Sequence, residues 1–176
     1  MLTKLAHLSY PKSKFAIVAL LSVNVIFYAL TDTLTSTLDA LVWLILLIMF
    51  ELEANQNLSV LTPKQLHTIR NLLIVIIAGV FISYVSSSEW LDVSNALLWF
   101  ALIALLELEI RRPTWVAKYQ QLYWYATILM FTGLIAMVFA WALNSDWLDA
   151  YDAMLWITAF AMIEVDIFQF LKIKHL

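Results

Sequence analysis

Three pairs of acidic residues are the feature of this sequence that could carry chemistry. Each pair follows a long apolar stretch, and the pairs are Glu51 and Glu53, Glu107 and Glu109, and Glu164 and Asp166. Two residues span roughly 200° around a helix, so the carboxylates of one pair point to opposite faces and cannot chelate one ion together. The chemistry of each pair therefore depends on which carboxylate faces a neighbouring helix.

One hypothesis places Glu51, Glu107 and Glu164 around a common axis. A ring of carboxylates at the mouth of a pore attracts cations, so this arrangement predicts a small cation or proton channel or transporter. However, the residues that share the face of Glu51 include Leu44 and Leu47, which offer no hydrophilic path.

The other hypothesis makes the acidic pairs structural. An acidic residue in the last turn of a helix interacts unfavourably with the helix dipole, and so does a basic residue in the first turn. A salt bridge between the acidic end of one helix and the basic start of another would offset both unfavourable interactions. The candidate basic partners are Lys14, Arg70, Arg111 and Lys118. Glu107 and Arg111 also have the i,i+4 spacing of a pair within one helix. We favour salt bridges between helices, and we expect the loss of Glu51, Glu107 or Glu164 to lower stability by about 1–3 kcal/mol.

The composition indicates the environment in which these helices fold. Of 176 residues, 64% are apolar and 13% are charged, and the mean hydropathy is +0.87. In soluble domains about half of the residues are apolar and about a quarter are charged, so this chain has the composition of an integral membrane protein. The sequence lacks cysteine, which excludes disulfides and thiolate chemistry.

The sequence contains no recognised catalytic motif. It has no G-x-S-x-G, no H-E-x-x-H and no phosphate-binding glycine loop. All three histidines lie outside the apolar stretches, so we expect no haem or metal ligand within the membrane. We interpret Trp43, Trp99 and Trp156 as packing residues. We therefore expect no enzymatic activity, no cofactor and no bound metal, and the dispersed basic residues predict no nucleic-acid partner.

Six apolar segments predict the fold class, which is all-α and polytopic. The segments cover residues 15–30, 40–50, 72–85, 96–106, 122–143 and 153–163. Several are shorter than the ~20 residues needed to cross ~30 Å of hydrocarbon. Including the polar ends restores the length, because a helix from Trp90 to Arg111 rises roughly 31 Å. We predict six transmembrane helices in a single transmembrane domain, residues 1–176.

All ten lysine and arginine residues fall on one side of the predicted spans. The positive-inside rule then places both termini and the longer loops in the cytoplasm and the short acidic turns outside. The small size and short loops favour a bacterial inner membrane.

An internal repeat organises the six segments into three units. Shifts of 56 and then 57 residues superpose Ala40, Ala96 and Ala153, Trp43, Trp99 and Trp156, and the three acidic pairs. The units cover approximately residues 12–57, 68–113 and 120–171. Each unit enters and leaves on the cytoplasmic side, so we predict three parallel helical hairpins in a six-helix bundle.

The predicted function is that of an accessory or scaffold subunit. Long apolar faces, short loops and spans without internal proline favour packing against other membrane components. The expected partners are the lipid bilayer and either other membrane protein subunits or further copies of the chain. The alternative is the cation or proton channel or transporter described above.

Overall fold

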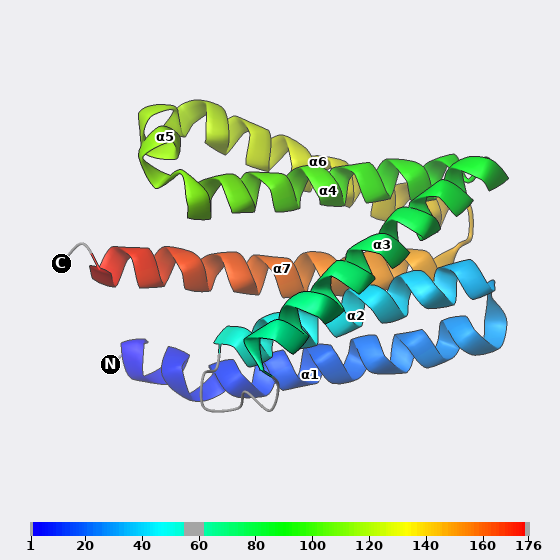
Figure 1. The fold of residues 1–176 in the computed structure, drawn as a ribbon, viewed down its shortest axis with the longest axis horizontal. Coiled ribbons are helices and arrows are strands. Elements are labelled where there is room, and N and C mark those ends of the chain that lie inside the picture. Colours follow the sequence, from blue (N-terminus) through cyan, green and yellow to red (C-terminus); the bar gives the residue numbers. More distant parts are fainter. Residues whose placement is uncertain (1, 55–61, 175–176) are drawn as a thin grey trace. The chain divides into compact units, whose positions relative to one another are not determined.

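The computed structural model describes the backbone of residues 2–54 and 62–174 and the side chains of residues 15–49, 62, 64–109 and 111–161. Within these residues all regular secondary structure is helical, which confirms the predicted all-α class (Figure 1). The helices are α1 (Leu2–Thr31), α2 (Leu34–Ala54), α3 (Pro63–Ser87), α4 (Trp90–Arg111), α5 (Pro113–Lys118), α6 (Gln120–Leu143) and α7 (Trp147–Lys174). The short helix α5 was not predicted, because it lies in the connection between two apolar segments.

The chain divides into two compact units, Met1–Ser87 and Ser88–Leu176. In the first unit, α2 packs against both α1 and α3. In the second unit, α6 packs against both α4 and α7, and α5 lies at the end where α4 leads into α6 (Figure 1). The boundary between the units falls inside the second predicted repeat, residues 68–113. The three-hairpin arrangement therefore stays a prediction.

Local sequence signals explain where several helices begin. Thr62 and Gln65 form a capping box, because the Gln65 backbone N–H donates to Thr62 Oγ1 at 3.3 Å and the Thr62 N–H donates to Gln65 Oε1 at 2.8 Å. Pro63 then occupies the first position of α3, where no backbone N–H is needed. At the start of α2, Thr33 Oγ1 accepts a hydrogen bond from the Ser36 N–H at 3.1 Å.

Two of the tight turns use a serine in the left-handed region. Ser88, which follows α3, has a φ of 62°, and Ser145, which follows α6, has a φ of 68°. Such values are uncommon for residues other than glycine. Because each turn is so short, the next helix starts within two residues, at Trp90 and Trp147.

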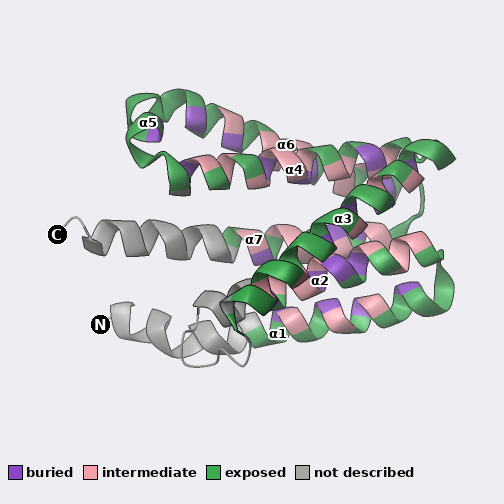
Figure 2. Cartoon of the chain, in the orientation of Figure 1, coloured by how far each residue is buried: buried purple, intermediate pink, exposed green. Residues whose placement is uncertain are grey.

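The buried residues form narrow stripes beside residues of intermediate burial, and much of the remaining helix surface is exposed (Figure 2). Many of the exposed residues are large and apolar. On α1 the stripe consists of Ile17, Leu21, Asn24 and Tyr28. On α3 it consists of Leu73, Ile77, Val80 and Tyr84. Steps of three and four residues keep each stripe on one face of its helix. One face of each helix therefore packs inside its unit while the others remain available to the surroundings.

Three helical segments in the described residues are long and apolar enough to cross a membrane, and they are Lys64–Ser87, Trp90–Glu109 and Gln120–Leu143. Shorter apolar helical segments cover Phe15–Thr31 and Leu34–Met49. These lengths are consistent with a membrane protein, as the composition predicts. The count of six spans stays a prediction.

Candidate functional site

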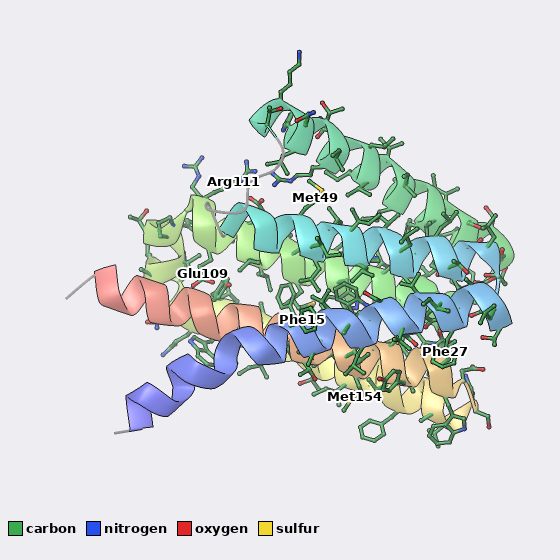
Figure 3. The ribbon with its side chains drawn as sticks, turned by 90° about the horizontal axis from the view of Figure 1, so that it is seen from below. Phe15, Phe27, Met49, Glu109, Arg111 and Met154 are labelled. Atoms are coloured by element: carbon green, nitrogen blue, oxygen red, sulfur yellow. The ribbon has the colours of Figure 1, made fainter. Side chains whose placement is uncertain are left out.

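The two carboxylates at the end of α4 have different surroundings. The Glu107 side chain is 53% exposed and forms an ion pair with Arg111 on the same helix. The Arg111 side chain is 76% exposed and extends outward from the end of α4 (Figure 3). This pair has the i,i+4 spacing noted in the sequence. Both residues belong to α4, so the pair does not connect α4 to another helix.

Glu109, in contrast, faces the neighbouring helix α6. It is only 9% exposed, and its Oε2 accepts a hydrogen bond of 2.7 Å from the hydroxyl of Tyr123. Tyr123 is also buried and stands in the first turns of α6. A hydrogen bond to a charged acceptor contributes more than one between neutral groups, so this contact ties the end of α4 to the start of α6.

The partner of Glu109 was not predicted from the sequence. The predicted partners of the acids are basic residues, whereas Tyr123, which faces Glu109, is a phenol with a hydroxyl donor. One feature of the sequence could have suggested this partner. A tyrosine, Tyr123, stands near the start of the apolar segment that follows Glu107 and Glu109.

The polar part of the interface between α4 and α6 is short. Thr127 lies one helical turn beyond Tyr123 and is buried, and its Oγ1 has no hydrogen-bond partner among the described residues. Further along the same face, Leu134 is 1% exposed. The interface thus changes from polar to apolar within about three turns of the Glu109 contact.

A second, partly buried polar contact joins α2 to α3 in the first unit. Asp39 accepts hydrogen bonds from Trp43 Nε1 at 2.9 Å and from the Tyr84 hydroxyl at 3.2 Å. Nearby, the hydroxyls of Thr35 and Ser83 lie 3.3 Å apart. These contacts hold the start of α2 against the end of α3 and use donors from both helices.

Asn95 occupies the position in the second predicted repeat that Asp39 occupies in the first. Its Oδ1 is buried and has no hydrogen-bond partner among the residues that the structure describes. A buried acceptor without a donor lowers the free energy of unfolding, because it has lost the hydrogen bonds that water makes to it in the unfolded chain. Equivalent positions of the predicted repeat thus differ in hydrogen bonding.

An aromatic cluster fills the interior of the second unit. Trp99 from α4 meets Trp156 and Phe160 from α7, with ring centroids 6.5 and 5.6 Å apart and both pairs edge to face. Phe131 from α6 lies 6.3 Å from Phe160. The rings pack on one another in the geometry that aromatic pairs prefer. Trp99 therefore packs against two rings of α7, and the cluster as a whole draws rings from three helices.

The other predicted site residues are spread over the chain. Arg70 is exposed on α3, and the Lys118 ammonium lies 5.2 Å from the centre of the Tyr119 ring. Five predicted residues lie outside the described side chains, and they are Lys14, Glu51, Glu53, Glu164 and Asp166. Among the described residues, no three histidine, aspartate or glutamate side chains gather into a group that could hold a metal ion.

Comparisons of the chain with protein family models, curated proteins and solved structures found no match. Any functional interpretation therefore depends on the residues themselves. In the described part of the chain, the acidic site of α4 contains one exposed ion pair and one buried hydrogen bond between helices.

Proposed function

We propose that this chain is a non-catalytic integral membrane protein that acts as an accessory or scaffold subunit. The observation that carries the proposal is the broad exposed apolar surface of helices long enough to cross a membrane. On α3 it includes Leu72, Ile74, Val75, Ile82 and Val85. On α6 it includes Leu122, Ile128, Leu129, Ile135 and Phe139. Exposed apolar area of this extent is typical of surfaces that contact lipid or another protein.

In this proposal the acidic residues stabilise the fold. Glu109 joins two helices through Tyr123, and Glu107 is paired on its own helix. The interface beyond Thr127 becomes apolar at Leu134, which favours a structural contact over a route for ions. Six spans in three parallel hairpins, cytoplasmic termini and a bacterial inner membrane belong to the same proposal.

Cross-linking in the native membrane tests the proposal. A photoreactive residue placed at Phe139, which is 64% exposed, should form a covalent adduct of one fixed mass with another membrane subunit or a second copy of the chain. The same residue at the buried Leu134 should react only within the chain. Extraction in mild detergent should then yield a complex of constant stoichiometry.

Isolation of the chain solely as a monodisperse monomer, without adducts at Phe139, would contradict an accessory role. The purified chain could instead conduct cations or protons in liposomes. If this flux is lost in the Glu107→Gln or Glu109→Gln variant, the proposed function should change from an accessory role to transport.

A further inference from the structure

Basic and aromatic side chains gather at the connection between α4 and α6, which we call the α5 corner. It is defined by Arg111, Arg112, Trp115, Lys118, Tyr119, Trp124 and Tyr125. All seven are exposed. The four aromatic residues expose between 40% (Tyr119) and 72% (Tyr125) of their surface. Large aromatic side chains left this exposed beside cations form a surface with both apolar and charged character.

The side chains of α5 contact one another directly. The rings of Trp115 and Tyr119 lie 4.9 Å apart at an angle of 48°. The Lys118 ammonium lies 5.2 Å from the centre of the Tyr119 ring, within the range of a cation–π interaction. Val116 is buried, so one face of the short helix anchors it while the aromatic and basic face remains outside.

The charge of the α5 corner is positive. Arg111 is paired with Glu107, and the buried Glu109 is engaged by Tyr123. Arg112 and Lys118 have no carboxylate partner among the described residues. Two exposed cations are therefore available beside the exposed aromatic rings.

The position of the α5 corner along the helices determines what can reach it. Two segments long enough to cross a membrane flank α5. The segment Trp90–Glu109 ends just before α5, and the segment Gln120–Leu143 begins just after it. If both cross the bilayer, as the proposed function requires, the corner lies at the level of the lipid headgroups. Tryptophan and tyrosine are enriched at this level because one part of each ring system is apolar and another forms hydrogen bonds.

We propose that the α5 corner binds the phosphate group of an anionic phospholipid. Arg112 and Lys118 pair with the phosphate oxygens, and Trp115 and Tyr119 lie against the boundary between headgroup and acyl chain. A basic residue near an anionic membrane surface contributes about 1 kcal/mol, which corresponds to roughly five-fold in affinity. The inference rests on the proposed membrane location and specifies the lipid that this surface selects.

Native mass spectrometry of the full chain in detergent tests the proposal. Phosphatidylglycerol should bind more tightly than phosphatidylcholine with the same acyl chains. The double variant Arg112→Gln and Lys118→Gln should weaken phosphatidylglycerol binding by roughly 25-fold and leave phosphatidylcholine binding unchanged. Lys64→Gln is the matched control, because it removes an exposed cation from the start of α3 and should have no effect.

A second measurement does not depend on the charge variants folding. In nanodiscs, brominated phosphatidylglycerol should quench tryptophan fluorescence more strongly than the same fraction of brominated phosphatidylcholine. Trp115→Phe should reduce this difference, whereas Trp147→Phe, which removes another exposed tryptophan, should retain it.

Several outcomes would overturn the lipid site. Equal affinity for the two lipids, or an unchanged affinity in the double variant, would show that the α5 corner does not select anionic headgroups. Displacement of phosphatidylglycerol by millimolar inorganic phosphate would identify a free-phosphate site instead. None of these results affects the adducts at Phe139, so failure of this inference is distinguishable from failure of the accessory role.

Discussion

At the scale of single residues, neighbouring acids in this protein differ in what their loss should cost. Glu109 is buried and its carboxylate accepts the Tyr123 hydroxyl, whereas Glu107 and Arg111 are both largely exposed. Burial removes the water that could replace a lost partner. The contribution of a contact to the free energy of unfolding therefore depends more on its burial than on whether the partners carry opposite charges.

Removal of the Tyr123 hydroxyl should destabilise the protein. Tyr123→Phe leaves the buried Glu109 carboxylate without its donor, and we expect a loss of about 1–3 kcal/mol in the free energy of unfolding. Chemical denaturation in detergent, followed by circular dichroism, measures the change. Tyr125→Phe is the control, because Tyr125 is 72% exposed and its hydroxyl should contribute little. Equal stability of Tyr123→Phe and the unmodified chain would show that the hydrogen bond contributes nothing.

The structure also changes the expected cost of Glu107→Gln. From the sequence alone we expected a loss of about 1–3 kcal/mol, on the assumption that the partner base is partly buried. Because the observed partner Arg111 is exposed, we now expect a change within about 0.5 kcal/mol. The same denaturation assay should show a smaller effect at higher salt. A loss as large as that of Tyr123→Phe would indicate a burial of Glu107 that the structure does not show.

Asp39 and Asn95 should respond to truncation in opposite ways. Asp39→Ala removes the acceptor of two hydrogen bonds, one within α2 and one from α3, and we expect a loss of about 1–3 kcal/mol. Asn95→Ala removes a buried oxygen that has no partner among the described residues, so we expect it to be nearly neutral or stabilising. Thermal unfolding of both variants in one detergent provides the comparison. A large loss for Asn95→Ala would reveal a partner for its amide.

At the scale of helices, the two glycines distinguish a packed face from an open one. A Cβ added at Gly133 on α6 would stand 2.8 Å from Leu98 Cδ2, whereas a Cβ at Gly79 on α3 would meet nothing within 4 Å. The first glycine therefore permits a close approach of α6 to α4, and the second has no packing role in the described structure.

Substitution of the two glycines tests this difference. Gly79→Ala should raise the free energy of unfolding by about 0.5–1 kcal/mol, because alanine restricts the unfolded chain and favours the helix. Gly133→Ala should not show this increase, because the Leu98 side chain must move to admit the new methyl group. Gly133→Leu should lower the free energy of unfolding by about 1–3 kcal/mol through overpacking. If Gly133→Leu is as stable as the unmodified chain, α6 does not pack against α4 through this glycine.

The helices α1 and α3 of the first unit bury equivalent positions of the predicted repeat. The buried stripe of α3, from Leu73 to Tyr84, lies 56 residues after that of α1, from Ile17 to Tyr28. The starts of α2, α4 and α7 at Leu34, Trp90 and Trp147 follow the same register. The same register therefore recurs in these elements, and the repeat stays a prediction.

At the scale of the whole molecule, the orientation in the membrane is open to direct test. The chain contains no cysteine, so single cysteines can be introduced as labels. In intact cells, cysteines at Ser87 and Ser145 should react with an impermeant thiol reagent, and one at Gln56 should react only after the membrane is opened. Labelling of Gln56 in intact cells would reverse the topology that the distribution of basic residues predicts.

By itself, the sequence determined the helical class, the membrane-like composition and the helix from Trp90 to Arg111. These properties are local, because they depend on composition and on the length of apolar segments along the chain. The two-residue spacing of the acidic pairs also established that Glu107 and Glu109 point to opposite faces of α4. It did not establish which of the two meets another helix.

Only the tertiary structure decided that Glu109 faces α6 and pairs with Tyr123 and that Glu107 stays exposed. The physical reason is rotational. Residue spacing sets the angles between side chains on one helix, but the rotation of that helix about its axis depends on packing against its neighbours. Close approaches such as that of Gly133 to Leu98 set this rotation, and they involve residues far apart in the chain.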